Sequence, residues 1–242
     1  MSQDSEIETE MKARGHWAER FKEFQSDRGN PRRVAFARVG DATRRVIERL
    51  VATMTTNEEL DNIAAQIEGI ANALERYPMG RTYEGFSEAA NAGSPGGFFD
   101  HSPISGVANP IAPPLKFEAP DLDGDSEKKI VAHVNFGSAY EGPPGCVHGG
   151  YLAAAFDELL GRAQSLCGNP GMTANLTINY RKPTPLKADL EFEGVLVKVD
   201  GRKVYTRGRC MHNGVLTAEA EALFVSINFE KLAELAQLQR RA

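Results

Sequence analysis

A glycine-rich stretch that leads into an apolar segment holds the first residues with the right types and spacing for chemistry. It reads Gly142-Pro143-Pro144-Gly145-Cys146-Val147-His148-Gly149-Gly150. Glycines at the start of a helix let another group approach the bare backbone N–H donors closely. Those donors lie at the positive end of the helix dipole, so they suit an anion or a developing oxyanion. The alternative is a glycine-rich turn without a ligand, and His148 beside the glycines favours a site.

The second candidate is Asp157, a carboxylate inside the otherwise apolar run 152–160. Burying a carboxylate is costly unless it has partners, so Asp157 is either functional or a solvated, satisfied polar residue. Glu158 fits the second description better, because adjacent helical residues point to different sides. A carboxylate in a partly dry site can take a proton from water near neutral pH, which makes Asp157 a candidate base.

The spacing between these candidates limits how they can cooperate. Asp157 follows His148 by nine positions (157 − 148 = 9). On one helix that spacing places the two residues about 13 Å apart along the axis and roughly half a turn apart around it. A single helix therefore cannot bring both to one reacting atom. If both act, one must come from a second copy of the chain, which predicts a two-fold dimer with composite sites.

The elements that must position these residues follow from the hydrophobic pattern. The segment 148–166 is apolar nearly all round, which is typical of a buried helix. Strand-like segments lie at 129–137, 173–181, 190–199, 203–212 and 215–227. Asp200-Gly201 and Asn213-Gly214 predict tight hairpins between the last three, and Gly194 predicts a bulge or bend. One buried helix wrapped by a long, curved antiparallel sheet is the hotdog fold, of the α+β class.

The N-terminal part of the chain has a different character. Residues 41–75 carry two apolar stripes at helical spacing, which predict an antiparallel helical hairpin, and a weaker amphipathic segment lies around Trp17 and Phe21. We expect these helices to cover a core or to build an interface. The predicted organisation is an N-terminal helical extension at 1–90, a Gly/Pro-rich connection at 91–114, the hotdog domain at 115–228 and a C-terminal helix at 229–242.

Composition excludes several classes of function. The net charge of −5 argues against a nucleic-acid protein, and no apolar run approaches the roughly 20 residues that cross a bilayer. The N-terminus is polar and acidic and does not look like a signal peptide, which predicts a cytoplasmic protein. The cysteines are odd in number without CxxC pairing, and the histidines show neither HxH nor HxxxH spacing. We therefore expect reduced thiols and no metal site.

Three stretches of the chain resemble a known family. HGGYLAAAFDELLG, GMTANLTINYRKPTPL and AEAEALFVSI resemble the hotdog acyl-CoA thioesterases of the phenylacetate-pathway (PaaI-like) group. The resemblance covers about residues 96–228 and leaves residues 1–90 outside. It implies a dimer, or a dimer of dimers, that hydrolyses acyl-CoA and needs no cofactor, since coenzyme A is part of the substrate.

The resemblance also implies roles for single residues. Gly149 would supply the N–H that polarises the thioester carbonyl, and His148 would help to position the thioester. Asp157 of the partner chain would act as general base on water or as nucleophile, and both roles stay open. Thr173 matches a Ser or Thr that orients the water. Two further residues are predicted to bind substrate: Gly150 and Asn175.

A basic cluster offers a place for the phosphates of coenzyme A. Residues 181–211 contain eight basic and four acidic side chains (8 − 4 = 4), in a chain that is acidic as a whole. Several of them alternate along one strand and so share a face, and arginine suits phosphate groups. A solvated outer face of a strand is the alternative. The predicted contacts are Arg181, Lys203 and Arg207.

Two other functions compete with hydrolysis. A hotdog dehydratase or hydratase acting on acyl thioesters usually depends on an Asp–His pair that exchanges protons with carbon. Here His148 precedes the helix and Asp157 lies within it, which disfavours that reaction. A non-catalytic acyl-CoA-binding or regulatory protein is the second alternative, with the N-terminal helices serving partner recognition.

Overall fold

The computed structural model describes residues 29–77, 97–118, 129–168 and 171–226. The segment around Trp17 and Phe21 and the C-terminal helix predicted at 229–242 lie outside these described residues. None of the described helices is both long enough and apolar enough to cross a membrane.

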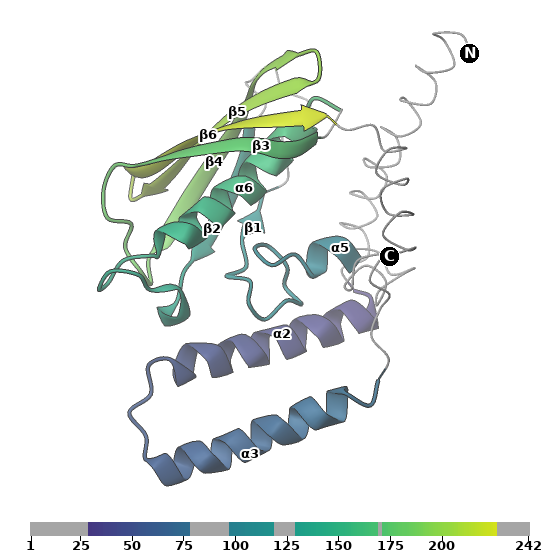
Figure 1. Ribbon diagram of the computed structural model, residues 1–242, viewed down its shortest axis with the longest axis vertical. Coiled ribbons are helices and arrows are strands. Elements are labelled where there is room, and N and C mark those ends of the chain that lie inside the picture. Colours follow the sequence, from purple (N-terminus) through teal and green to yellow (C-terminus); the bar gives the residue numbers. More distant parts are fainter. Residues whose placement is uncertain (1–28, 78–96, 119–128, 169–170, 227–242) are drawn as a thin grey trace, which may run out of the picture.

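A six-stranded sheet and one long helix form the body of the molecule (Figure 1). The strand order is β1-β2-β4-β5-β6-β3, and every neighbouring pair is antiparallel. Helix α6 (Gly149–Ser165) lies across one face of this sheet. The predicted hotdog fold is confirmed. The strands are β1 (Lys116–Phe117), β2 (Lys129–Asn135), β3 (Gly171–Tyr180), β4 (Asp189–Asp200), β5 (Lys203–His212) and β6 (Val215–Ser226).

The core lies between α6 and the sheet, and two glycines allow the close approach. Gly194 of β4 pairs with Gly208 of β5 directly beneath the helix. A Cβ atom on Gly194 would come within 3.0 Å of Cγ of Leu159, a fully buried residue of α6. Of the predicted bulge or bend at Gly194, the bulge is wrong, since Gly194 is in regular register and the irregularity in this pair of strands lies between Leu196 and Lys198. Position 194 holds a glycine in place of a larger apolar residue because Leu159 of α6 occupies the space that a side chain there would take.

Both predicted hairpin turns are confirmed as two-residue connections. Asp200 pairs with Lys203, and the intervening Gly201 has a φ of +57°. Between β5 and β6, Asn213 and Gly214 have φ values of +49° and +75°. Asparagine and glycine are the residues that tolerate this left-handed backbone, so the sequence sets the register of the long strands locally.

The predicted helical hairpin is also present, with an earlier start. Helix α2 (Pro31–Leu50) begins ten residues before position 41 (41 − 31 = 10), with Asn30 as its N-cap. Helix α3 (Asn57–Leu74) begins with a complete capping box between Thr56 and Glu59. Pro31 suits this start, because proline is favoured in the first helical turn. Gly40 lies farther along α2 and packs against the backbone of the connection at Val107 and Ala108.

Polar contacts join α2 to the rest of the chain. The Arg33 guanidinium donates to the Asp100 carboxylate at 2.6 Å; the Asp100 side chain is buried and that of Arg33 is 9% exposed. Asp100 ends the short helix α5 (Gly97–Asp100), which opens the connection into the body. Arg44 donates to the carbonyls of Val107 and Asn109 in that connection. Helix α2 is thereby fastened along the connection by charged and backbone groups, with Gly40 its one buried residue.

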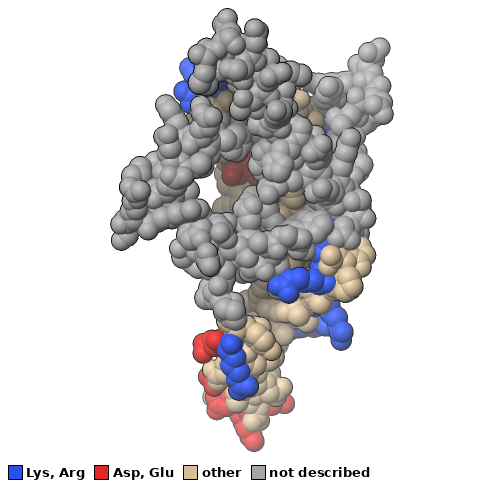
Figure 2. Space-filling view, turned by 90° about the vertical axis from the view of Figure 1, so that its right-hand side faces the viewer, with Lys and Arg blue, Asp and Glu red and all other residues tan. Residues whose placement is uncertain are grey.

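Within the described part of the chain helix α3 has no comparable attachment, and none of its residues is buried there. The two helices carry opposite charge: α2 holds six arginines and two acids (6 − 2 = +4), and α3 holds four acids and no base (−4). Figure 2 shows acidic side chains gathered at the lower end of the molecule, where Figure 1 places α3, with basic side chains above them. A groove of about 430 Å³ lies along α3 and reaches Leu50 of α2.

Candidate active site

His148 forms the N-cap of α6 and organises the entry to the helix. Its Nδ1 accepts the N–H of Gly150 at 3.0 Å. Its own N–H donates to the carbonyl of Tyr140 at 2.9 Å. A neutral imidazole that accepts at Nδ1 carries its proton on Nε2, so the exposed ring presents an N–H donor at the helix mouth. Tyr140 and Tyr151 pack edge to face beside it, with ring centroids 4.8 Å apart.

Gly149 is the first residue of α6, and its N–H is the available donor at this mouth. Among the described residues, none accepts a hydrogen bond from that N–H. The Gly150 N–H is already used by His148. The Gly149 carbonyl accepts the Tyr180 hydroxyl at 2.8 Å, and a Cβ at position 149 would lie 3.2 Å from that hydroxyl oxygen. The mouth therefore offers one free backbone N–H at the positive end of the helix dipole.

Asp157 lies on an exposed flank of α6, beside strand β3. The Thr173 hydroxyl donates to its Oδ1 at 2.8 Å. The structure thus brings together Asp157 and Thr173, two of the residues predicted from sequence. A hydroxyl donor of this kind fixes the orientation of a carboxylate and leaves its second oxygen accessible.

A bulge in β3 separates Asn175 from this pair. Two residues apart in a regular strand, Thr173 and Asn175 would share a face, but the register with β6 shifts between them. Thr173 pairs with buried Phe224 on the helix side of the sheet. Asn175 instead lies on the outer side with Thr177, whose hydroxyl donates to it at 3.2 Å. Asn175, which is predicted from the sequence to bind substrate on the assumption that it shares the face of Thr173, therefore lies on the other face.

The basic residues predicted to meet coenzyme A lie away from the helix. Lys203 and Arg207 are exposed and alternate along β5 with buried residues, which places them on the outer face of the sheet. Arg181 forms an ion pair with Glu219. Arg181 directly follows Tyr180, which contacts Gly149, so it is the member of this set nearest to the mouth along the chain, while its partner Glu219 alternates along β6 with buried residues.

Two residues of the site, Tyr180 and Glu158, form contacts that the sequence did not predict. Tyr180 fastens the mouth to β3, and its side chain faces the helix because the bulge at Ala174 resets the alternation of the strand. Glu158 accepts hydrogen bonds from Ser105 at 2.5 Å and from Arg162 at 3.1 Å. Burial lowers the pKa of Arg162, and the nearby Glu158 carboxylate raises it, with a net lowering. Ser105 belongs to the connection, so Glu158 ties that segment to α6 next to Asp157.

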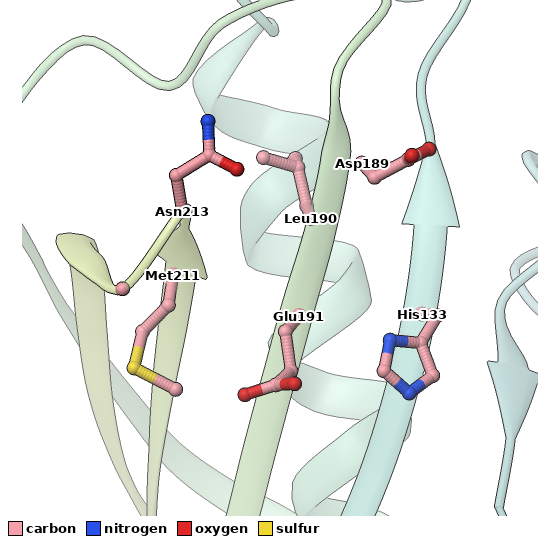
Figure 3. A pocket seen from close by; sticks show the side chains of 7 residues that line it. His133, Asp189, Leu190, Glu191, Met211 and Asn213 are labelled. Atoms are coloured by element: carbon pink, nitrogen blue, oxygen red, sulfur yellow. The ribbon is translucent and has the colours of Figure 1, made fainter.

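A separate hollow of about 240 Å³ lies on the outer face of the sheet, at the ends of β2, β4 and β5. Figure 3 shows its side chains in front of the strands, with α6 behind them. His133, Glu191 and Met211 form a cross-strand row in it. No predicted site residue lines this hollow or the groove along α3, so the candidate site is the helix mouth and the Asp157 flank.

Comparison with known proteins gives the chain its family. The family model described as "Thioesterase superfamily" matches residues 144–214, which include the mouth, α6 and strands β3 to β5. A crystal structure of a thioesterase superfamily protein is similar at 34% sequence identity and a TM-score of 0.64. That similarity covers 78% of this chain and 94% of the other. The chain belongs to the thioesterase superfamily. The matched region of this superfamily contains the mouth residues His148 and Gly149 and the pair Asp157 and Thr173.

Curated relatives in the thioesterase superfamily are similar over a shorter stretch. The acyl-coenzyme A thioesterase THEM4 of Xenopus laevis is 39% identical over 105 residues, which are 42% of this chain and 47% of the relative. THEM4 of Bos taurus is 35% identical over 119 residues, 48% of this chain and 49% of the relative. The similarity thus spans about half the length of these relatives.

Proposed function

We propose that this chain hydrolyses acyl-CoA thioesters to a free acid and coenzyme A. The observation that carries the proposal is the free Gly149 N–H at the mouth of α6, together with the Asp157–Thr173 pair on the exposed flank. One group stabilises a negative oxygen, and the other accepts a proton from water. Membership of the thioesterase superfamily and the names of the curated relatives support the same reaction.

In the proposed reaction the thioester carbonyl oxygen approaches the Gly149 N–H, with the His148 ring beside it. As general base, Asp157 takes a proton while the water oxygen bonds to the carbonyl carbon. The carbonyl π electrons move onto the oxygen at the helix mouth. Collapse of that intermediate breaks the C–S bond, and the thiolate leaves as coenzyme A after taking up the proton. In the nucleophile route, Asp157 first forms an anhydride that water then opens, and both routes need the same placement of groups.

We propose that each complete site combines two chains. The axial separation of the helix mouth and Asp157 on one α6 requires a second copy. Among the described strands β3 is one of the two edges of the sheet; it is ten residues long and leaves most of its side chains exposed. An unpaired edge of this length is a ready surface for pairing, and Asp157 lies beside it. A two-fold dimer across this edge, alone or doubled to a tetramer, would carry one chain's carboxylate towards the other chain's mouth.

We also propose contacts for coenzyme A, a cellular location and a place for the N-terminal residues. Arg181, next to the mouth contact of Tyr180, is our first choice for a phosphate of coenzyme A, with Lys203, Arg207 and Gly150 as further predicted contacts. We propose that no cofactor takes part, that the protein works in the cytoplasm, and that residues 1–90 form an extension to the hotdog domain. The acyl group that the protein prefers is identified by the assay that follows.

A thiol-release assay across short, long and aromatic acyl-CoAs tests the proposal. We expect the wild-type protein to release coenzyme A thiol and Asp157→Asn to lower kcat/KM by roughly 10²–10³-fold, because the general base is lost. Thr173→Ala should lower it by about 10-fold, since it leaves the carboxylate present but less well oriented. Full activity in Asp157→Asn would contradict the proposal. Binding without thiol release would indicate a non-catalytic protein, and an enoyl product would indicate a dehydratase.

A further inference from the structure

We propose that Glu48 of helix α2 is a positioning residue for the mouth of α6, so that the N-terminal extension takes part in setting the candidate site. The inference rests on the proposed function only for its activity readout. The route runs from Glu48 to the short helix η2 (Ser138–Tyr140) and from η2 to His148. Figure 1 shows the C-terminal end of α2 beneath the N-terminal end of α6.

The first step is the grip of Glu48 on the η2 turn. Its Oε2 accepts the N–H of Ala139 at 3.3 Å, and Ser138 donates to the same carboxylate. Gly137, just before the turn, leaves the space that the carboxylate occupies, because a Cβ there would collide with Glu48. Lys187 completes the contact at 3.5 Å. The carboxylate thus contacts both the turn and Lys187, although its side chain is still 35% exposed.

The second step is the connection from the turn to the mouth. The carbonyl of Tyr140, the last residue of η2, accepts the N–H of His148 at 2.9 Å. Next to this contact, Glu141, which follows Tyr140, forms an antiparallel bridge with Val147, which precedes His148. A Cβ on Gly142 would lie 2.8 Å from the His148 Cα, so the two segments are in direct backbone contact. A displacement of η2 consequently moves the backbone that carries the Gly149 N–H.

The charge of Glu48 supports the same placement. Its partial burial raises the pKa of the carboxyl. Hydrogen bonds from the turn and the charge of Lys187 outweigh that effect, and the pKa ends below its ordinary value. The carboxylate is thus ionised near neutral pH and acts as an acceptor only. The ion pair with Lys187 is partly exposed, and exposed pairs contribute little stability. The main effect of Glu48 is therefore to fix the position of the η2 turn.

Two readouts test this role, with Asp41→Asn as the matched control. Asp41 is an exposed carboxylate on the same helix and forms an ion pair with Arg45, one turn further along. In glycine-labelled protein, Glu48→Ala should shift the amide resonances of Gly149 and Gly150, and Glu48→Gln should return them most of the way. With an acyl-CoA that the wild type hydrolyses, Glu48→Ala should lower kcat about 10-fold with little change in KM. Asp41→Asn should change neither.

A second perturbation guards against a misfolded variant. Gly137→Ala leaves the carboxylate in place and pushes against it from the turn, so it should shift the same two glycine resonances. If Glu48→Ala and Gly137→Ala both leave these resonances and kcat at wild-type values, the inference is wrong. If the wild type hydrolyses no acyl-CoA, the proposed function fails, and the resonances alone still decide whether Glu48 positions the mouth.

Discussion

Helices α6 and α3 differ by one residue in length, yet the chain uses them in opposite ways. Seven residues of α6 are buried, and none of α3 is. Both have an apolar stripe at helical spacing, so the stripe predicts a helix without predicting what covers it. Helix α2 is intermediate, since charged side chains and one buried glycine hold it to the connection. The difference teaches that stability resides in the hotdog body, while the N-terminal helices contribute through individual contacts.

The largest expected effect comes from matched truncations in the two helices. Leu159 of α6 is fully buried against Gly194, and Leu159→Ala should lower the free energy of unfolding by about 2–5 kcal/mol. Ile67 of α3 is 40% exposed, and Ile67→Ala should change it by less than about 0.5 kcal/mol. Urea unfolding of both variants checks the comparison. Equal losses would show that α3 is covered as completely as α6.

A buried thiol gives the hotdog body a pH dependence on the alkaline side, whereas the shifted groups of the N-terminal helices, Glu48 and Glu59, titrate on the acid side. Burial raises the pKa of Cys210 from 9.0 to about 11. The contribution of this thiol to the free energy of unfolding is therefore complete below pH 9. It is lost as the pH rises towards 11, because the unfolded chain releases the thiol proton at a lower pH than the folded chain does. Between pH 8 and 10.5 the free energy of unfolding of the wild type should fall by up to ~2 kcal/mol more than that of Cys210→Ala, with the half-buried Cys146→Ala as control. An identical pH profile for wild type and Cys210→Ala would contradict this assignment.

Two glycines sharpen the contrast between α2 and α3. A Cβ on Gly40 would lie 2.6 Å from the carbonyl oxygen of Val107, whereas a Cβ on Gly69 would meet nothing within 4 Å. Gly40→Ala should destabilise by about 1–2 kcal/mol through overpacking. Gly69→Ala should stabilise by about 0.5–1 kcal/mol, because alanine is the better helix former. Thermal melts of both variants should shift in opposite directions, and a gain from Gly40→Ala would mean that α2 does not press on the connection.

The smallest effect concerns the start of α3. Thr56→Ala removes the N-cap and should lower the local stability of α3 by about 1 kcal/mol without affecting the body. Hydrogen bonds from Thr55 and Thr56 lower the pKa of Glu59 to about 2, so its part of the capping box is complete above pH 4.5 and is lost as the pH falls towards 2. Hydrogen exchange in α3 should accelerate in Thr56→Ala while exchange in α6 is unchanged. Faster exchange in both helices would show that they unfold together.

The sequence predicts the body well because its signals are local. The apolar pattern of 148–166 and the turn residues at Gly201 and Asn213-Gly214 each specify one element without reference to the rest. The placement of Asn175 could not be predicted, since the bulge at Ala174 has neither glycine nor proline to announce it. The role of Glu48 could not be predicted either, because its partners at the η2 turn lie about 90 residues away in the chain. Such contacts depend on packing between distant segments.

The central claim is that the helix mouth of one chain works with the Asp157 of another. To test it, Asp157→Asn chains and Gly149→Pro chains are co-expressed with different tags, and the mixed dimers are purified through both tags. Proline at the first helical position removes the N–H donor, and the extended backbone of His148 already suits a following proline. The account predicts that each variant alone is nearly inactive and that the mixed dimer recovers about half of the wild-type kcat, since one of its two sites is intact. Mixed dimers that are no more active than the separate variants would contradict it.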